Sequence, residues 1–322
     1  MSNSGIAALS AAEQISRAAA VIKRGGIVGL PTETVYGLAG DATNPRAVAR
    51  IYAAKGRPAF NPLITHAASV EEALAHGVFP AAAERLARAF WPGPLTLVVP
   101  FRPGSPVCDL ARAGLDSIAL RVPANQLALA VIAAAGVPLA APSANRSGRI
   151  SATSAGDIAS ELGEAVEFVI DGGRSAIGVE STIVSLLGPQ PVCLRIGGLP
   201  RAAIEAVTGQ TLMFDDGGML RAPGMLASHY APAAALRLNA AAVEPGEALL
   251  AFGPGLPAGH ANAAQVLNLS AKGDTVEAAA NLYAMLRKLD GSGPKLIAVA
   301  PVPEDGLGEA INDRLRRAAA PR

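Results

Sequence analysis

Short apolar runs alternate with helical segments along most of this chain, and that rhythm constrains the fold more than any other feature of the sequence. The runs have the length of buried strands and are too short for core helices. We expect strands at Ile27–Leu30, Leu95–Val99, Ser117–Val122, Phe168–Ile170, Ser181–Leu187 and Val192–Ile196. We expect helices near 81–90, 125–135, 154–162 and 200–208. This alternation is typical of α/β proteins.

Two further helices near the N-terminus carry clear start and stop signals. Ser10 and Glu13 have the spacing of a capping box, and two glycines at 25–26 end the apolar periodicity that follows. The next helix begins after Asn44 and ends at Gly56.

The length of 322 residues predicts two domains. Between about 210 and 234 the periodicity gives way to Asp, Gly and Pro, which indicates a linker. The remaining 88 residues hold strand candidates at 248–252, 266–269 and 296–300 and helices near 275–289 and 308–319. We therefore predict a first α/β domain over 1–209, a linker over 210–234, and a smaller Rossmann-like α/β domain over 235–322.

Composition excludes several classes of protein. The apolar fraction is 51%, yet no uninterrupted apolar run is long enough to span a membrane. The formal net charge of +1 gives no overall attraction to nucleic acid or to an anionic membrane. The two cysteines, Cys108 and Cys193, lie too far apart in sequence for a zinc site, and no export signal is visible, so we expect a cytoplasmic protein.

Standard catalytic motifs are missing from the sequence, but polar clusters stand where strands or helices end. The segment 31–37 places two threonines, a glutamate and a tyrosine after the first buried strand, where open α/β sheets tend to bind ligands. Lys55 and Arg57 follow a helix and have a spacing that suits a polyanion such as a triphosphate. For these two cations, stabilisation of the helix C-terminus is the competing interpretation.

A buried cation is expected on the strand 117–122. Ser117 and Arg121 share one face of this strand, and the apolar neighbours of Arg121 predict a buried guanidinium that needs an anionic partner. That partner is either a ligand or a carboxylate of the protein. The small residues of 141–148 allow close approach of a ligand, and their hydroxyls either bind phosphate or cap the next helix.

Taken together and in order, these clusters resemble the threonylcarbamoyl-AMP synthase family, the YrdC-like enzymes, in the long form that has an additional C-terminal domain. The matching segments are PTETVYGL at 31–38, KGRP and NPLI within 55–64, FWPGPLTLV at 90–98, LRVP at 120–123, APSAN and SG within 141–148, DGG at 171–173 and VESTIV at 179–184. HYAP at 229–232 and GLGEAINDRLRRAA at 306–319 extend the resemblance into the second domain.

The resemblance implies a fold, an activity and partners. The fold is a twisted open mixed sheet with helices, followed by the Rossmann-like domain. The activity joins L-threonine, bicarbonate or CO2, and ATP into threonylcarbamoyl-AMP and pyrophosphate. Mg²⁺ accompanies ATP, and a tRNA threonylcarbamoyl transferase complex consumes the product. Direct RNA binding beside catalysis stays an open alternative.

The resemblance also implies the residues of the site. Threonine is expected to be held by Thr34, His66, Arg121, the backbone at Ala141, and Ser181. ATP is expected to be held by Arg57, Asn61, Ser117, Ser143, Ser151, Arg195 and Tyr230. Lys55 and Arg57 are expected to stabilise charge on the phosphates during catalysis. The residue type that would ligate a metal stays unassigned.

Two departures from the family pattern limit what the resemblance implies, one inside the linker and one before it. The segment 226–228 lacks the basic residues that many family members carry there, and Ile196 replaces a commoner proline. The expected lid over the site therefore depends mainly on His229 and Tyr230. Two other functions are disfavoured by the sequence. A carbamoyl-transferring maturation protein would need a zinc finger, which two distant cysteines cannot build, and an RNA-binding module is disfavoured by the low net charge and by the 4% of aromatic residues.

Overall fold

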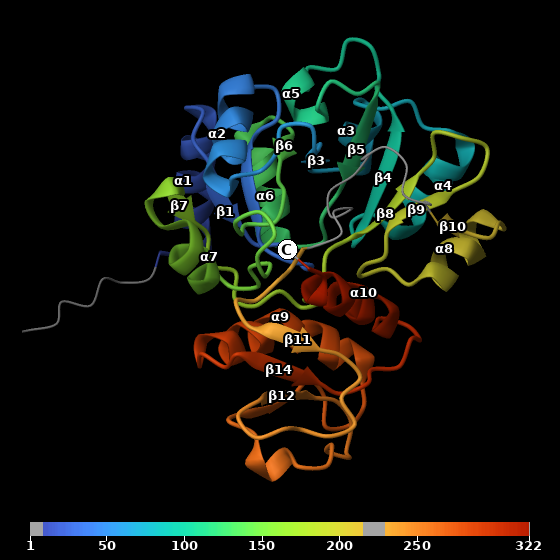
Figure 1. Cartoon of the computed structure of the whole chain (residues 1–322). Coiled ribbons are helices and arrows are strands. Elements are labelled where there is room, and N and C mark those ends of the chain that lie inside the picture. The colour runs from blue at the N-terminus through green and yellow to red at the C-terminus, as the bar shows by residue number, and fades with distance from the viewer. Residues whose placement is uncertain (1–8, 215–228, 322) are drawn as a thin grey trace, which may run out of the picture.

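The structure, a computed structural model, describes residues 9–214 and 229–321, which form two units with a sheet in each (Figure 1). The larger N-terminal unit has a ten-stranded sheet in the order β10-β9-β8-β4-β5-β3-β6-β2-β1-β7. Its strands are β1 (Val28–Leu30), β2 (Gly37–Asp41), β3 (Ile64–His66), β4 (Leu95–Pro100), β5 (Ser117–Arg121), β6 (Leu139–Ala140), β7 (Phe168–Val169), β8 (Thr182–Ser185), β9 (Val192–Arg195) and β10 (Met213–Phe214).

Parallel and antiparallel pairs are both present in this sheet. β3 pairs with β5 in parallel, whereas β4 pairs with β5 and β3 with β6 in antiparallel fashion. The central strands β4, β5 and β8 are almost continuously buried, as expected for strands covered on both faces. The mixed α/β sheet expected from the sequence is thus confirmed.

Helices α1 and α6 pack together near β1 and β2, while α4 and α8 pack together near the other end of the sheet. The helices of this unit are α1 (Ala11–Lys23), α2 (Pro45–Lys55), α3 (Val70–Leu74), α4 (Ala81–Phe90), α5 (Asp109–Arg112), α6 (Gln126–Ala135), α7 (Ala155–Leu162), the 3₁₀ turn η1 (Gly163–Ala165) and α8 (Arg201–Thr208). The capping box at Ser10 and the side-chain cap at Asn44 form as the sequence predicts.

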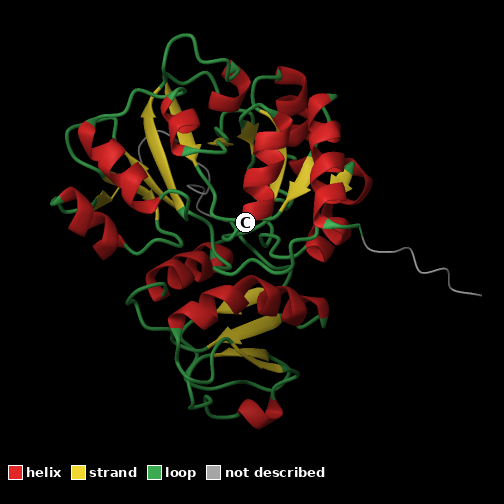
Figure 2. Cartoon of the chain, turned by 180° about the vertical axis from the view of Figure 1, so that it is seen from behind, coloured by secondary structure: helices red, strands yellow, loops and turns green. Residues whose placement is uncertain are grey.

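The C-terminal unit, residues 235–321, contains a four-stranded parallel sheet in the order β11-β14-β12-β13. Its elements are β11 (Ala235–Arg237), β12 (Ala248–Ala251), the 3₁₀ turn η2 (His260–Asn262), β13 (Val266–Asn268), α9 (Thr275–Gly291), β14 (Leu296–Val299) and α10 (Gly308–Ala319). Figures 1 and 2 show α9 and α10 between this sheet and the N-terminal unit. The second α/β unit predicted from the sequence is therefore present.

The structure differs from the sequence expectations at several short elements. β2, β3, β6 and β11 are not expected from the sequence, because β2 is rich in small residues and the other three have only two or three residues, which is too few for a periodic signal. β10 lies at 213–214, inside the segment expected to be linker, and pairs with β9. Most of the expected linker, residues 215–228, including the departure at 226–228, lies outside the described residues.

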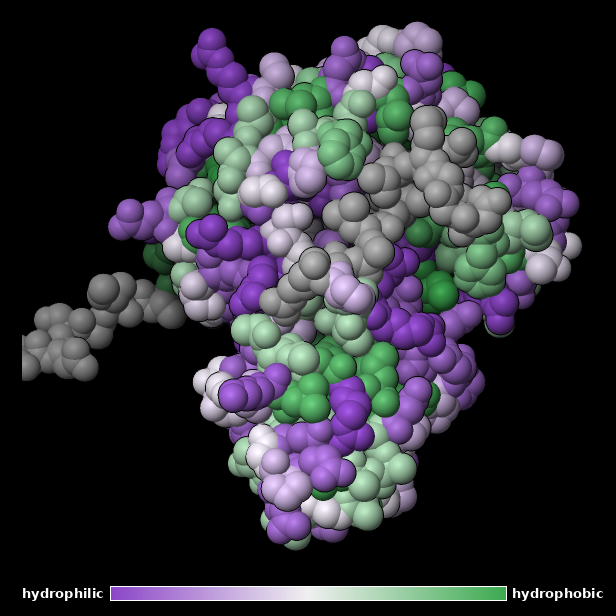
Figure 3. All heavy atoms as spheres, viewed as in Figure 1, coloured by the Kyte–Doolittle hydropathy of each residue, from purple (hydrophilic) through white to green (hydrophobic). Residues whose placement is uncertain are grey.

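The apolar side chains form separate cores in the two units, and one cluster crosses between them. That crossing cluster joins Val35, Ile150 and Val179 of the N-terminal unit to buried residues of α9 and α10. Figure 3 shows hydrophobic residues gathered on the C-terminal unit just below this junction. Among the described helices, none is long and apolar enough to cross a membrane.

Candidate functional site

A cavity in the N-terminal unit brings together segments that are far apart in the sequence. It is lined by the loop between β1 and β2, by residues of β3, β5 and β9, by residues that follow α2 and β6 or precede β8, and by the end of the linker. Nine residues predicted from the sequence line it: Thr34, Arg57, His66, Arg121, Ala141, Ser143, Ser181, Arg195 and Tyr230.

Arg121 is the buried cation that the sequence predicts, and it ends β5. Its guanidinium donates to the Thr34 hydroxyl over 2.9 Å, to the Gly93 carbonyl over 3.2 Å and to Glu33 Oε1 over 2.6 Å. The internal carboxylate that the sequence left as one alternative therefore exists, and it is Glu33. Because Glu33 is behind Arg121 and does not line the cavity, it fixes the guanidinium while leaving Arg121 part of the cavity wall.

His66 ends β3 beside Arg121, with which it is paired in the sheet register. Burial, assisted by the positive charge of Arg121, lowers the pKa of His66 to about 3. Its Nδ1 lies 3.2 Å from the Ile64 carbonyl. At neutral pH the imidazole is therefore uncharged, so it can offer a polar contact to a ligand without adding charge.

Ser181 and Arg195 meet at the base of the cavity. Arg195 Nη2 donates to the Ser181 carbonyl over 2.9 Å and to its hydroxyl over 3.0 Å. The Ser181 hydroxyl also lies 2.8 Å from that of Thr96, which is fully buried in β4. This contact from β4 fixes the position of the serine side chain.

The loop after α2 supplies the cations on another side of the cavity. Gly56 ends α2 with a φ of 59°, a left-handed conformation that turns the chain so that Arg57 reaches the cavity. Arg57 donates to the carbonyls of Asn61 over 3.2 Å and of Pro62 over 3.1 Å. Burial lowers its pKa to about 10, which still leaves it charged at neutral pH.

Tyr230 closes the cavity from the linker end. Its ring makes an edge contact with that of His229, with 4.0 Å between ring centroids, and stacks on that of Tyr283, with 5.8 Å between centroids. Burial lowers the pKa of His229 to about 3, and its Nδ1 has no hydrogen-bond partner among the described residues. His229 and Tyr230 therefore present an uncharged aromatic face to the cavity.

Four predicted residues do not line the cavity. Lys55 is buried behind it, and its Nζ donates to the carbonyls of Ser143 and Asn145. Burial, together with the charge of Arg57, lowers the pKa of Lys55 to about 7. Lys55 thus holds the 143–145 loop in place rather than facing the cavity.

Asn61, Ser151 and Ser117 are the other three predicted residues that do not line the cavity. Asn61 is buried beside Arg57, and its Oδ1 has no hydrogen-bond partner among the described residues. Ser151 is buried and donates to Glu180. Ser117 stands at the opposite end of β5 from Arg121, where it pairs with Pro100, so the shared strand face does not bring these two residues together.

Two carboxylates near the site had no role assigned from the sequence. Glu180 lines the cavity, and Glu33 fixes Arg121. Both lie inside the motifs PTETVYGL and VESTIV, so the polar clusters already pointed to them. What the sequence did not show is that each glutamate pairs with a buried arginine from elsewhere in the chain.

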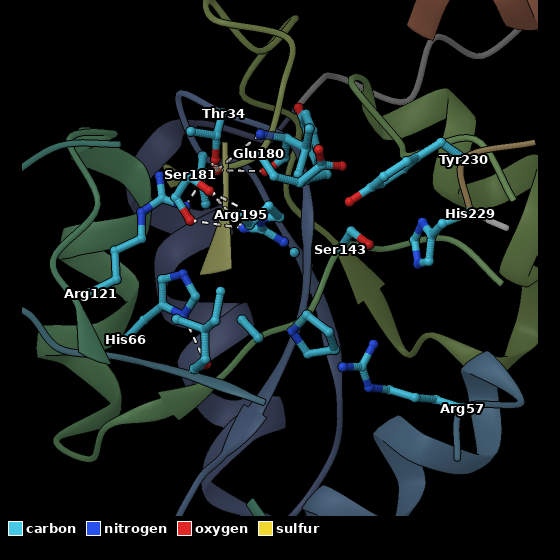
Figure 4. A pocket seen from close by; sticks show the side chains of 17 residues that line it. Thr34, Arg57, His66, Arg121, Ser143, Glu180, Ser181, Arg195, His229 and Tyr230 are labelled. Atoms are coloured by element: carbon cyan, nitrogen blue, oxygen red, sulfur yellow. Dashed lines mark hydrogen bonds between the residues drawn. The ribbon is translucent and has the colours of Figure 1, made fainter. Parts of the chain in front are cut away.

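Figure 4 shows that the cavity has two sides. Thr34, His66, Arg121 and Ser181 lie on one side, Arg57, His229 and Tyr230 lie on the other, and Ser143 and Arg195 lie between them. The walls carry three arginines, several hydroxyls and neutral imidazoles. This set suits an anionic ligand, or two such ligands side by side.

Comparison with known proteins places both units in one family. A family model described as telomere recombination matches residues 20–197, and one described as the C-terminal domain of threonylcarbamoyl-AMP synthase matches residues 199–320. The threonylcarbamoyl-AMP synthases of Pyrococcus abyssi and Bacillus subtilis are 43% and 38% identical, over 95% and 96% of this chain and 94% of each relative. The crystal structure of P. abyssi Sua5 complexed with L-threonine matches with a TM-score of 0.87 at 39% identity, covering 97% of this chain and 95% of that one.

Proposed function

Since this chain belongs to the threonylcarbamoyl-AMP synthase family, we propose that it joins L-threonine, bicarbonate or CO2, and ATP into threonylcarbamoyl-AMP, with release of pyrophosphate. One observation supports this more than any other. Of the residues that the family resemblance implies for threonine, Thr34, His66, Arg121 and Ser181 share one side of the cavity. Of those implied for ATP, Arg57 and Tyr230 lie on the other side, and Ser143 and Arg195 lie between the two sides.

In this proposal the threonine side recognises a small zwitterion. The Arg121 guanidinium binds the threonine carboxylate, because a charge-assisted pair is the strongest contact the cavity offers to that group. Thr34, Ser181, neutral His66 and the backbone at Ala141 contact the rest of the amino acid. The match to a relative complexed with L-threonine supports this assignment.

The nucleotide side holds ATP. Arg57 and Arg195 face the phosphates, Ser143 offers a hydroxyl, and Tyr230 supplies an aromatic face on which adenine can stack. The Asn61 amide lies next to Arg57 and still has an acceptor oxygen to satisfy. Ser151 acts from behind the wall through Glu180, and Lys55 acts through the 143–145 loop. Ser117, at the far end of β5, contributes no contact in this arrangement.

The reaction itself calls for cations rather than for a protein nucleophile. The threonine amine adds to CO2 and loses a proton, or adds to bicarbonate and releases water, to give a carbamate. A carbamate oxygen then forms a bond to the α-phosphorus while the bond to pyrophosphate breaks. Negative charge increases on the phosphoryl oxygens as this occurs, and Arg57 and Arg195 are placed to stabilise it.

Magnesium belongs to this proposal as part of the substrate MgATP. Among residues 9–214 and 229–321 there is no group of three His, Cys, Asp or Glu side chains that could hold a metal ion. The carboxylate that lines the cavity, Glu180, already accepts from Ser151, Tyr283 and Arg314. The protein therefore offers cations to the phosphates, and the phosphates themselves are the oxygen ligands that Mg²⁺ prefers.

The product is a mixed anhydride of a carbamate and a phosphate, which is reactive toward amines. We propose that it is passed in the cytoplasm to a tRNA threonylcarbamoyl transferase complex, which moves the threonylcarbamoyl group to the amino group of an adenosine in tRNA. Release of AMP in that step balances the AMP that the synthase attached.

The test is mass spectrometry of the product formed by purified protein with MgATP, L-threonine and bicarbonate. Each substrate is omitted in turn while pyrophosphate is followed. The proposal predicts a threonylcarbamoyl adenylate whose formation requires all three substrates. Pyrophosphate release without threonine, or no adenylate under any condition, would overturn it.

A further inference from the structure

A buried carboxylate joins the cavity to the C-terminal unit. Glu180 Oε1 accepts from the Ser151 hydroxyl over 2.6 Å, and Oε2 accepts from Arg314 Nε over 2.7 Å. The Tyr283 hydroxyl lies 2.9 Å from Oε2 and 3.1 Å from Oε1. Tyr283 belongs to α9 and Arg314 to α10, so two of the three groups that hold Glu180 come from the C-terminal unit.

These contacts are buried and electrostatically matched. The side chains of Arg314 and Glu180 are 0% and 5% exposed. Burial disfavours ionisation of Glu180, but the charges of Arg314 and Arg195 and the hydrogen bond from Ser151 outweigh it and lower the pKa of Glu180 to about 2. The glutamate is therefore an anion at neutral pH, and its position depends on the groups that compensate its charge.

The same two residues also determine the position of Tyr230. The Arg314 guanidinium lies 4.9 Å above the Tyr230 ring, and the Tyr283 ring stacks on it. Tyr230 has a φ of 64°, a left-handed conformation that a tyrosine adopts only when its surroundings impose it. The next residue, Ala231, donates its backbone N–H to the Gly148 carbonyl over 2.8 Å, which fixes the chain on the other side of the ring.

The junction is also tightly packed where Glu180 approaches it. Gly178 lies against α9 so closely that a Cβ atom there would be 2.3 Å from the Ala279 carbonyl oxygen. Arg314 Nη2 donates to the Ile196 carbonyl over 2.9 Å, directly after Arg195. The C-terminal unit thus contacts three segments that carry cavity residues: 178–181, 195–196 and 229–231.

We propose that Tyr283 and Arg314 are positioning residues for the nucleotide side of the cavity, so that the C-terminal unit completes the ATP site through Glu180 and Tyr230. Neither residue lines the cavity. The proposal rests on the proposed function, which places ATP on that side. Threonine recognition is not part of it, since Arg121, Thr34 and His66 are held by contacts within the N-terminal unit.

The competing interpretation is that these residues only fasten the two units together. Another cross-unit contact shows what plain fastening looks like: Arg287 of α9 pairs with Glu161 of α7 over 3.0 Å, and that glutamate does not line the cavity. The two interpretations differ in one measurable respect. Fastening affects the amount of folded enzyme, whereas positioning changes the KM for ATP and leaves the KM for threonine unchanged.

The experiment measures both KM values in the full-length variants Tyr283→Phe and Arg314→Lys. Tyr283→Phe removes one hydrogen bond to Glu180 and keeps the ring, and Arg314→Lys keeps the charge and removes the planar guanidinium. Loss of a hydrogen bond to a charged group predicts a KM for ATP raised roughly 10-fold in each variant, with the KM for threonine within about twofold of wild type.

The matched control is Arg237→Lys. Like Arg314, Arg237 pairs with a buried carboxylate: its Nε lies 3.0 Å from Oε1 of Glu247, which is in the C-terminal unit. Arg237 itself lies in β11, away from the cavity. We expect both KM values to stay at wild-type level in this variant. The positioning role is overturned if Tyr283→Phe and Arg314→Lys fold and keep the wild-type KM for ATP, or if they raise both KM values equally. Failure of the proposed function is distinguishable, because then the wild-type protein makes no adenylate.

Discussion

The two sides of the cavity are built by different means. The threonine side consists of residues at the ends of β3 and β5 and in the loop after β1, and its hydrogen bonds stay within one unit. The nucleotide side combines a loop after α2 with the linker end and with helices of a second unit. In the proposed assignment, the small substrate binds at the ends of two central strands, and the larger substrate binds to parts of two units that must first come together.

Because the two sides are built differently, substitutions in different places should affect different substrates. A substitution at the strand ends changes threonine recognition and leaves the junction intact. A substitution at the junction changes the nucleotide side, because Glu180 and Tyr230 take their positions from there. A variant of either side should therefore change the KM for one substrate and not for the other.

The largest effect is expected at Gly178, where the junction is tightest. Gly178→Ala places a Cβ 2.3 Å from the Ala279 carbonyl oxygen and forces alanine to a φ of 78°. The left-handed backbone costs about 1–2 kcal/mol and the overpacking a further 1–3 kcal/mol. We expect the variant protein to have a lower melting temperature and a higher KM for ATP than the wild type, with the KM for threonine unchanged.

Gly173→Ala is the control for this prediction. Gly173 has a similar φ of 73°, and no atom lies within 4 Å of the Cβ that would be added there. It therefore carries the backbone cost without the clash. Equal destabilisation by the two alanines would mean that packing against α9 contributes nothing, and the comparison between the two sides would lose its structural basis.

Arg121→Ala tests the threonine side. The variant removes a charge-assisted contact of about 1.5–3 kcal/mol, which predicts a KM for threonine roughly 10- to 150-fold higher, while the KM for ATP stays near the wild-type value. The measurement is steady-state pyrophosphate release at varied threonine and at varied ATP. Arg112→Ala is the control, since Arg112 pairs with Asp109 and packs on Phe101 away from the cavity. A folded Arg121→Ala enzyme with an unchanged KM for threonine would contradict the assignment.

The neutral state of buried His66 predicts that the free energy of unfolding depends on pH. An unfolded imidazole takes up a proton below about pH 6.5, whereas folded His66 stays neutral down to about pH 3. The unfolded state therefore binds more protons between these values, and the free energy of unfolding decreases as pH falls through this window. Between pH 6.5 and pH 5 the loss is about 2 kcal/mol for this one residue.

His66→Asn should remove that contribution. We expect the urea midpoint of the variant to fall less between pH 7 and pH 5 than that of the wild type, with unfolding followed by the fluorescence of Trp91, the single tryptophan of the chain. His260→Asn, at an exposed position, is the control. If the two variants and the wild type show the same pH dependence, His66 is not held neutral in the folded protein.

Much of the site was predictable from the sequence, because its residues follow strands in motifs with a fixed order. Arg121 between two apolar neighbours predicted a buried guanidinium with an anionic partner, and Glu33 is that partner. Ser117 does not line the cavity, and its expected contact with ATP stays a prediction. Residues four apart on a strand share a face but lie about 13 Å apart, so one end of β5 reaches the cavity and the other does not.

The junction could not be predicted in the same way. Which helix of the second unit meets Glu180 depends on how the two units dock, and no local pattern encodes that. One signal was present: Arg314 occupies the apolar face of α10, three residues after Ile311 and one before Leu315. A charged residue at a core position needs a buried partner, so the sequence indicated that Arg314 is paired without indicating with what.

The smallest effects are expected from two buried hydroxyls that stand behind the two sides. Ser151 donates to Glu180 on the nucleotide side, and the Thr96 hydroxyl lies beside that of Ser181 on the threonine side. The neutral Thr96 hydrogen bond is worth about 1 kcal/mol, or roughly a fivefold change in KM, and the Ser151 bond to the charged Glu180 is worth about 1.5 kcal/mol, or roughly a 10-fold change. Ser151→Ala should raise the KM for ATP, and Thr96→Val should raise mainly the KM for threonine. Each variant is the control for the other, because both remove one buried hydroxyl. An effect of this size of either variant on both substrates would mean that the two sides are coupled through Arg195, which contacts Ser181, rather than built independently.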